Sequence, residues 1–92
     1  MQAEEARFAP ADTVNWNDAG DELTLFDGAS DGYFALNGAA VAIWRELAAG
    51  RSVGETIDAL AVRFGASRAT VADDVAAFIR SALDRNLLVA RR

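Results

Sequence analysis

The side chains of this sequence that could do chemistry are mainly carboxylates, which occur as three adjacent acidic pairs. A pair of carboxylates can ligate a hard cation or act as a general acid and a general base. Such work needs supporting residues, and the sequence has neither the spacing of an EF-hand loop nor a glycine-rich phosphate loop followed by lysine. We therefore interpret the pairs as solvated surface charges and predict no metal site. They are Glu4-Glu5, Asp21-Glu22 and Asp73-Asp74. Asp74 is a partial exception, because it borders the apolar face of its predicted helix and can contact whatever lies beside that helix.

Histidine and cysteine are both missing from the 92 residues. Histidine is the commonest general base and metal ligand, and cysteine supplies disulfides and thiolate ligands. A Ser-His-Asp arrangement is therefore impossible. We predict a protein without catalytic residues and without a cofactor.

Length and composition describe one small domain. Apolar residues make up 52% of the chain and charged residues 25%, which is ordinary for a soluble protein. No apolar run approaches the roughly 18–20 residues that cross a bilayer, and the acidic N-terminus lacks the apolar segment of a signal peptide. We expect a single domain over residues 1–92, ordered over about 8–90, with no membrane partner and a cytoplasmic location.

The net charge of −5 argues against nucleic acid as a partner. A duplex binder needs cationic side chains that displace phosphate counterions, and an acidic domain begins with repulsion. The charge is also spread along the chain instead of sitting in one tail. We therefore predict no nucleic-acid partner.

The elements that must position any binding residue begin with a small sheet. Two β-prone runs, residues 23–26 and 33–36, flank two Asp-Gly pairs, and this pattern predicts a β-hairpin. With Trp16 on an earlier strand, the sheet has about three antiparallel strands and needs a helical layer on one face. Before it, the polar residues 1 to about 7 and Pro10 predict an irregular start.

Tyr33 and Phe34 are adjacent aromatic residues on one predicted strand. Successive side chains of a strand point to opposite faces, so only one of the two rings can enter the core. The other ring faces outward, where it is either covered by the N-terminal strand or lines a groove.

Two helices are predicted directly after the sheet. Asn37 is a good N-cap for a helix over about residues 38–49, and Gly50 stands where a left-handed cap belongs. A capping box begins at Ser52, and the helix that follows it ends at Gly65. The apolar stripe of the first helix is Ala40, Ile43, Trp44 and Leu47. The stripe of the second helix, which we predict to be buried, is Ile57, Leu60, Ala61 and Phe64.

A third and longest helix is predicted over about residues 68–86. Its apolar face carries Val71, Val75, Phe78, Ile79 and Ala82, and the apolar residues 87–89 then pack under the helices or add a strand. The predicted order β-β-β-α-α-α is an α+β fold. Two helices joined by a short glycine-containing turn after a hairpin resemble a small winged helix-turn-helix domain.

Residues of fixed type recur in a fixed order through this predicted framework. They are Leu36-Asn37, Ala40, Ile43-Trp44, Leu47, Gly50, Glu55, Ile57, Leu60, Phe64, Asp74-Val75, Phe78-Ile79, Leu83 and Leu87-Leu88. This set resembles the PqqD-like family over about residues 20–90. Members are RiPP recognition elements, small domains that hold the leader peptides of ribosomally made, post-translationally modified peptides. The resemblance implies a three-stranded sheet followed by three helices, which agrees with the pattern.

The segments 25–27 and 32–37 look more like the small discrete proteins of lasso peptide clusters than like the cofactor-maturation type. The chain departs from its relatives at Ala40 and Asn86, where glycine is common. Alanine preserves close packing there, and asparagine tolerates left-handed geometry. The resemblance implies a non-catalytic adaptor that delivers a leader to a separate leader peptidase, with a cyclase or another modifying enzyme as a further partner.

In family members the leader adds a strand to the third strand of the sheet and lies in a cleft against the third helix. A strand edge offers unpaired amides and carbonyls, and pockets beside it select side chains. The resemblance implies a backbone edge from Tyr33, Phe34, Ala35 and Leu36, apolar walls from Val71, Val75 and Phe78, and polar contacts from Asp74, Ser81 and Arg85. The alternative for Phe78 is that its side chain lies only in the core and does not contact the peptide.

Two other classes of function remain open. The alternative is a winged helix-turn-helix DNA-binding transcriptional regulator, although the helix that would enter the major groove sets Arg68, Arg80 and Arg85 against three aspartates. A reading helix is normally cationic, whereas this one is about neutral. A structural or dimerisation module is a third possibility, because an exposed strand edge can pair with its own copy.

Overall fold

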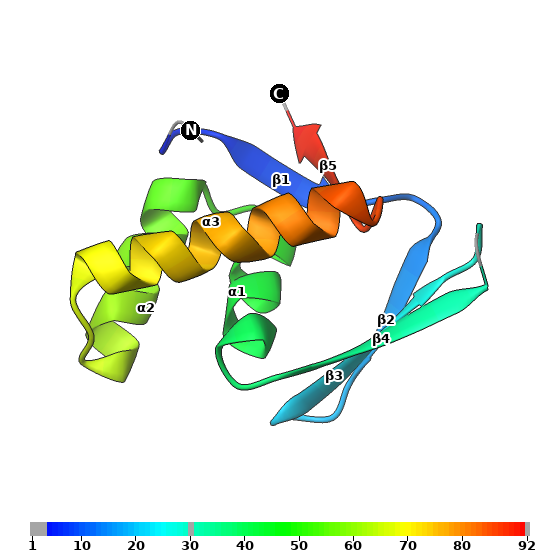
Figure 1. Ribbon diagram of the computed structural model, residues 1–92, viewed down its shortest axis with the longest axis horizontal. Helices are drawn as coiled ribbons and strands as arrows, with labels where there is room; N and C mark the ends of the chain where they lie inside the picture. Colours follow the sequence, from blue (N-terminus) through cyan, green and yellow to red (C-terminus); the bar gives the residue numbers. More distant parts are fainter. Residues whose placement is uncertain (1–3, 30, 92) are drawn as a thin grey trace.

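The computed structural model of the chain describes residues 4–29 and 31–91 (Figure 1). The predicted α+β order of three antiparallel strands followed by three helices is confirmed, and a further short strand lies at each end of the described chain. The elements are β1 (Arg7–Pro10), β2 (Val14–Asp18), β3 (Glu22–Asp27), β4 (Gly32–Asn37), α1 (Ala39–Ala48), α2 (Val53–Phe64), α3 (Arg68–Asp84) and β5 (Leu88–Arg91).

The main sheet has the antiparallel order β2-β3-β4, and the predicted hairpin joins its last two strands. Asp27 braces the hairpin turn, because its buried carboxylate accepts hydrogen bonds from the Thr13 hydroxyl and the Ala29 amide. Asp31 adopts a φ of 56°, a left-handed geometry that aspartate tolerates better than most residues. Within the described residues no strand pairs with the outer edge of β4, which leaves that edge open.

One face of the main sheet packs on α1. Leu23 and Leu25 alternate along β3 and are both fully buried, as the period of two in a strand requires. Trp16 of β2 meets the buried Trp44 of α1 edge to face, with ring centroids 5.5 Å apart. The sheet is thus held against the helices by a few large side chains.

The helix starts follow local capping chemistry. At α2, Ser52 accepts a hydrogen bond from the Glu55 amide and the Glu55 carboxylate accepts one from the Ser52 amide, which confirms the capping box. The prediction of Asn37 as N-cap of α1 is wrong, because the N-cap is Gly38. Gly38 has a φ of 58°, a geometry that suits glycine at this sharp exit from β4.

The helix ends use left-handed residues. Gly65 closes α2 with a φ of 61°, as predicted, and Gly50 follows the α1 cap with a φ of 92°. Helix α3 ends at Asp84, two residues earlier than expected, and Asn86 takes the left-handed turn with a φ of 60°. These turns direct the chain back over the helices.

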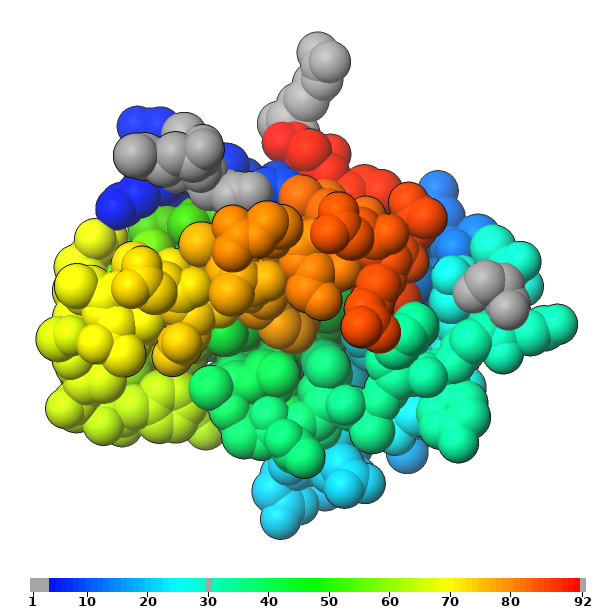
Figure 2. Space-filling model, in the orientation of Figure 1, coloured from blue at the N-terminus to red at the C-terminus, as the bar shows by residue number. Residues whose placement is uncertain are grey.

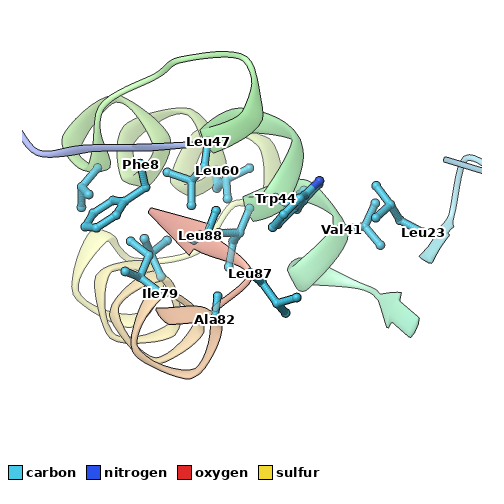
Figure 3. Packing of buried hydrophobic residues seen from close by; sticks show 14 of the residues in the cluster. Phe8, Leu23, Val41, Trp44, Leu47, Leu60, Ile79, Ala82, Leu87 and Leu88 are labelled. Carbon is cyan, nitrogen blue, oxygen red and sulfur yellow. The ribbon is translucent and has the colours of Figure 1, made fainter. Parts of the chain in front are cut away.

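The core lies where the three helices, β1, β5 and the inner face of the main sheet converge (Figure 3). Phe8, Leu60, Ile79 and Leu88 come from four different elements and are all buried. The prediction that Phe64 is buried is wrong, since its side chain is 49% exposed. The buried stripe of α2 extends only to Leu60.

The N-terminal and C-terminal segments form a second, two-stranded antiparallel sheet. Strand β1 pairs with β5, with Phe8 opposite Ala90 and Pro10 opposite Leu88, and the two strands lie side by side in Figure 1. The expected irregular start is therefore wrong for residues 7–10, whereas the added C-terminal strand is one of the two predicted outcomes. This sheet closes the core on the side away from β4.

Candidate functional site

A groove of about 410 Å³ opens beside β4 and the C-terminal half of α3. Figure 2 shows these two elements side by side on one face of the molecule, next to the start of α1. The groove combines an open strand edge with an apolar floor, which is the geometry that accepts an added strand. Its lining residues are Leu25, Tyr33, Phe34, Ala35, Leu36, Ala40, Phe78, Ser81, Ala82, Arg85 and Leu87.

Strand β4 forms one wall, and its side chains alternate. Phe34 and Leu36 are half-buried and pack against the core, whereas Tyr33 and Ala35 are exposed. Tyr33 is 71% exposed and packs on Phe26 at 6.3 Å between ring centroids. The outward ring is therefore Tyr33, and the N-terminal strand does not cover it.

Helix α3 forms the facing wall through a stripe at helical spacing. Phe78, Ser81 and Arg85 lie three and four residues apart, so Arg85, the residue that caps the C-terminal end of α3, continues the face on which Phe78 and Ser81 lie. Phe78 is half-buried and packs against the core as well as lining the groove. The Arg85 guanidinium lies 5.1 Å from the centroid of the Phe34 ring, which connects the helix to the strand.

The floor comes from residues that sequence reasoning did not identify as site residues. Leu25 lies opposite Phe34 in the β3–β4 register, and Leu87 follows the left-handed turn after α3. Ala40 and Ala82 complete the floor from α1 and α3. The signal for Leu25 was the hairpin itself, since counting back from its turn pairs that residue with Phe34.

Seven of the ten predicted site residues thus line one groove, and three do not. Val71 and Val75 are buried in the core, where they hold α3 in place. Asp74 is exposed and lies four residues before Phe78, so it continues the same helical stripe beyond the end of the groove.

The carboxylates with shifted pKa values lie away from this groove. Hydrogen bonds from Arg45 and from the Gly20 amide lower the pKa of Asp18 to about 2. Hydrogen bonds from Arg68 lower the pKa of Glu4, and hydrogen bonds from Ser52 lower that of Glu55. Asp18 thus stabilises the turn before β3, Glu4 holds the N-terminal segment to Arg68, and Glu55 caps the start of α2.

The acidic pairs gather no further ligands. Over residues 4–29 and 31–91, no group of three or more histidine, cysteine, aspartate or glutamate residues lies close enough to hold a metal ion. No helix in that part of the chain has both the length and the apolar character that crossing a bilayer requires.

A second hollow of about 460 Å³ lies on the other side of the start of α1. It is bordered by the turn between β2 and β3 and by the end of α2, where Arg63 lies 5.7 Å from the centroid of the Phe64 ring. None of its lining residues belongs to β4, so this hollow offers no place for a strand added to that edge.

Two solved structures share this fold, and each of those proteins is bound to a leader peptide. TbiB1 in complex with the TbiA(beta) leader peptide superposes with a TM-score of 0.84 at 29% identity, over 87% of this chain and 93% of that one. Lasso peptide synthetase B1 complexed with the leader peptide has the same fold, with a TM-score of 0.82 at 24% identity over 95% of this chain and 99% of that one.

Sequence comparison identifies the family. A PqqA binding protein from Gluconobacter oxydans (strain 621H) is 44% identical over 55 residues, 60% of this chain, and the match spans only 57% of that protein's length. The family model for coenzyme PQQ synthesis protein D (PqqD) matches residues 22–88, which run from β3 to the first residue of β5 and include both walls of the groove. This chain therefore belongs to the PqqD family.

Proposed function

We propose that this chain binds the leader segment of a ribosomally made precursor peptide, as a strand added to β4 in the groove beside α3. The observation that carries the proposal is the open β4 edge directly beside an apolar groove. An extended peptide gains main-chain hydrogen bonds from such an edge and seats alternate side chains in the pocket. The likeness to TbiB1 bound to a leader peptide supports the same use of the fold.

The proposal gives each of the ten predicted site residues a role. Backbone groups of Tyr33 to Leu36 pair with the peptide, while Phe34 and Phe78 contact an apolar peptide side chain. Ser81 and Arg85 offer polar contacts at the groove wall. Val71 and Val75 act indirectly by fixing α3, and Asp74 contacts only a peptide that continues past the groove.

We infer a non-catalytic adaptor that acts in lasso peptide biosynthesis, in which chemistry is left to other proteins. A leader held on one edge presents the rest of the precursor to a leader peptidase, and then to a cyclase or another modifying enzyme. Precursors of this kind are made on ribosomes, so the adaptor would meet them in the cytoplasm.

The charges on α3 support a DNA-binding regulator less well than they support a peptide-binding protein. Arg68 at the start of that helix is paired with both Glu4 and Asp58, at 2.6 Å and 2.7 Å. It is therefore not free to contact a phosphate, and Asp73, Asp74 and Asp84 are exposed on the same helix.

A dimerisation module would use the same β4 edge as the leader.

The experiment is a fluorescence anisotropy titration of labelled leader peptides from precursors encoded near this gene. Proline is introduced at Tyr33 and, separately, at Phe34, because neighbouring amides of a strand point to opposite edges. Alanine at the same two positions is the matched control, since alanine keeps the amide. Far-UV circular dichroism identifies the proline variant that keeps its fold.

Binding of one leader at micromolar affinity or tighter supports strand addition if the folded proline variant loses it. The alanine counterpart should keep that binding at Tyr33, and at Phe34 it should weaken it by no more than the roughly tenfold expected from losing the ring. Saturable binding of a DNA operator with no binding of any leader contradicts the proposal. A β4-dependent dimer in size-exclusion chromatography, without leader binding, would favour the dimerisation module instead.

A further inference from the structure

Arg85 is the single charged residue among those that line the groove. The other lining residues from β3, β4, α1 and α3 are apolar, apart from the hydroxyls of Tyr33 and Ser81. A lone cation beside an apolar pocket gives the groove an electrostatic preference, because its field is not cancelled by a facing carboxylate.

The Arg85 guanidinium has no hydrogen-bond acceptor and no ion-pair partner among the described residues. By contrast, Arg7, Arg45, Arg51 and Arg68 each pair with a carboxylate of this chain. The donors of Arg85 are therefore available to a ligand, whereas those four arginines serve the fold.

Contact with Phe34 restricts where the guanidinium can lie. The ring centroid is 5.1 Å away, so the aromatic ring takes up one side of the cation. A guanidinium carries five N–H donors in a planar fork, and ring contact does not use them. The stack thus holds a carboxylate-binding fork beside the pocket before any peptide arrives.

We propose that Arg85 makes the groove selective for leaders that carry an acidic side chain next to the apolar side chain seated between Phe34 and Phe78. This inference rests on the proposed function and adds the chemical class of peptide that the same site prefers. A charge-assisted fork contact in a partly desolvated groove is worth about fivefold to tenfold in affinity.

Arg80 provides a matched control on the same helix. It is exposed, has no ion-pair partner among the described residues, and lies five residues before Arg85, which places it on another face of α3. Arg80→Glu therefore changes net charge by the same amount as Arg85→Glu without altering the groove.

The experiment selects from random 15-residue peptides displayed on their encoding RNA, with the immobilised full chain as bait. Wild type, Arg85→Glu and Arg80→Glu are used in parallel after circular dichroism confirms that each is folded. We expect wild type and Arg80→Glu to enrich aspartate or glutamate at a fixed offset from an apolar residue. Arg85→Glu should enrich lysine or arginine at that position.

Anisotropy with an enriched peptide and its Glu→Lys counterpart then measures the preference. A fivefold to tenfold preference of wild type for the acidic peptide, reversed in Arg85→Glu only, supports the inference. A different result would overturn the inference and leave the proposed function intact. In that result the selected peptides lose binding in the proline variant, so they need the β4 edge, but their charge preference is the same in all three proteins. Peptides that bind without the β4 edge, or no enrichment at all, overturn both.

Discussion

The guanidinium of Arg85 lies 5.1 Å from the centroid of the Phe34 ring, across the groove between α3 and β4. A contact of this kind at an exposed site stabilises by about 0.5–1 kcal/mol. It links the C-terminal end of α3 to the open strand β4 across the groove.

Replacing Phe34 by alanine should lower leader affinity about tenfold, because the groove loses an apolar wall and Arg85 loses its stacking partner. The matched control is Phe26→Ala, which removes an exposed ring from the outer face of the same sheet. Anisotropy titration measures both variants. Equal loss of affinity in the two would show that the sheet, and not this groove wall, was affected.

Phe78→Ala should weaken two properties together, since Phe78 both lines the groove and packs on the core. We expect a loss of about 2 kcal/mol in the free energy of unfolding, less than for a fully buried phenylalanine. Phe64→Ala, at an exposed position of α2, should cost under about 1 kcal/mol and leave affinity unchanged. Urea unfolding and anisotropy give the two numbers. Normal leader affinity in a folded Phe78→Ala would remove Phe78 from the site.

Asp74→Arg should lower the binding affinity only of leaders that extend past the groove, because Asp74 lies one helical turn beyond Phe78. Asp73→Arg makes the same charge change about 100° around the helix and should have no effect. Titration of a full leader and of a version shortened at either end tests this. An equal response of long and short peptides would mean that Asp74 acts by another route.

The stability of the protein should depend on pH through Asp18, which lies at the turn before β3. Its Oδ2 atom accepts a hydrogen bond from Arg45 Nε at 2.7 Å. Its pKa is lowered from 3.8 to about 2, so its stabilising effect is present above about pH 4 and lost as the pH falls toward 2. Asp18→Asn should therefore be less stable than wild type at pH 6, and the difference should shrink at pH 3. Tryptophan fluorescence during urea unfolding follows this, and a difference that is independent of pH would contradict it.

Local signals in the sequence predicted those parts of the fold that local interactions determine. The capping box at Ser52 and the left-handed Gly65 depend on residues within one turn, and both are present. Pairing of β1 with β5 joins residues 7–10 to 88–91, and nothing near Pro10 indicates so distant a partner. Phe64 illustrates the same limit, because helical periodicity gives the direction of a side chain but not whether a neighbour lies there.

The candidate site shows a similar division. The resemblance to the PqqD-like family implied the strand edge and the facing helix, and residue spacing alone places Phe78, Ser81 and Arg85 on one face of that helix. Leu25 and Leu87 reach the groove only because other elements bring them there. Val71 lies on the same apolar face of α3 as Phe78, but it is buried in the core and does not line the groove. Its burial depends on which elements pack against that part of the helix.

Amide hydrogen exchange, measured by NMR with and without a bound leader, tests strand addition most directly. If the leader pairs with β4, exchange should slow at alternate amides of β4, within residues 32–37, while the edge amides of β2 keep their rates. Alternation matters because only every second amide of an edge strand points outward. Unchanged exchange rates of the β4 amides in a saturated complex, or protection of the β2 amides instead, would show that the leader does not pair with β4.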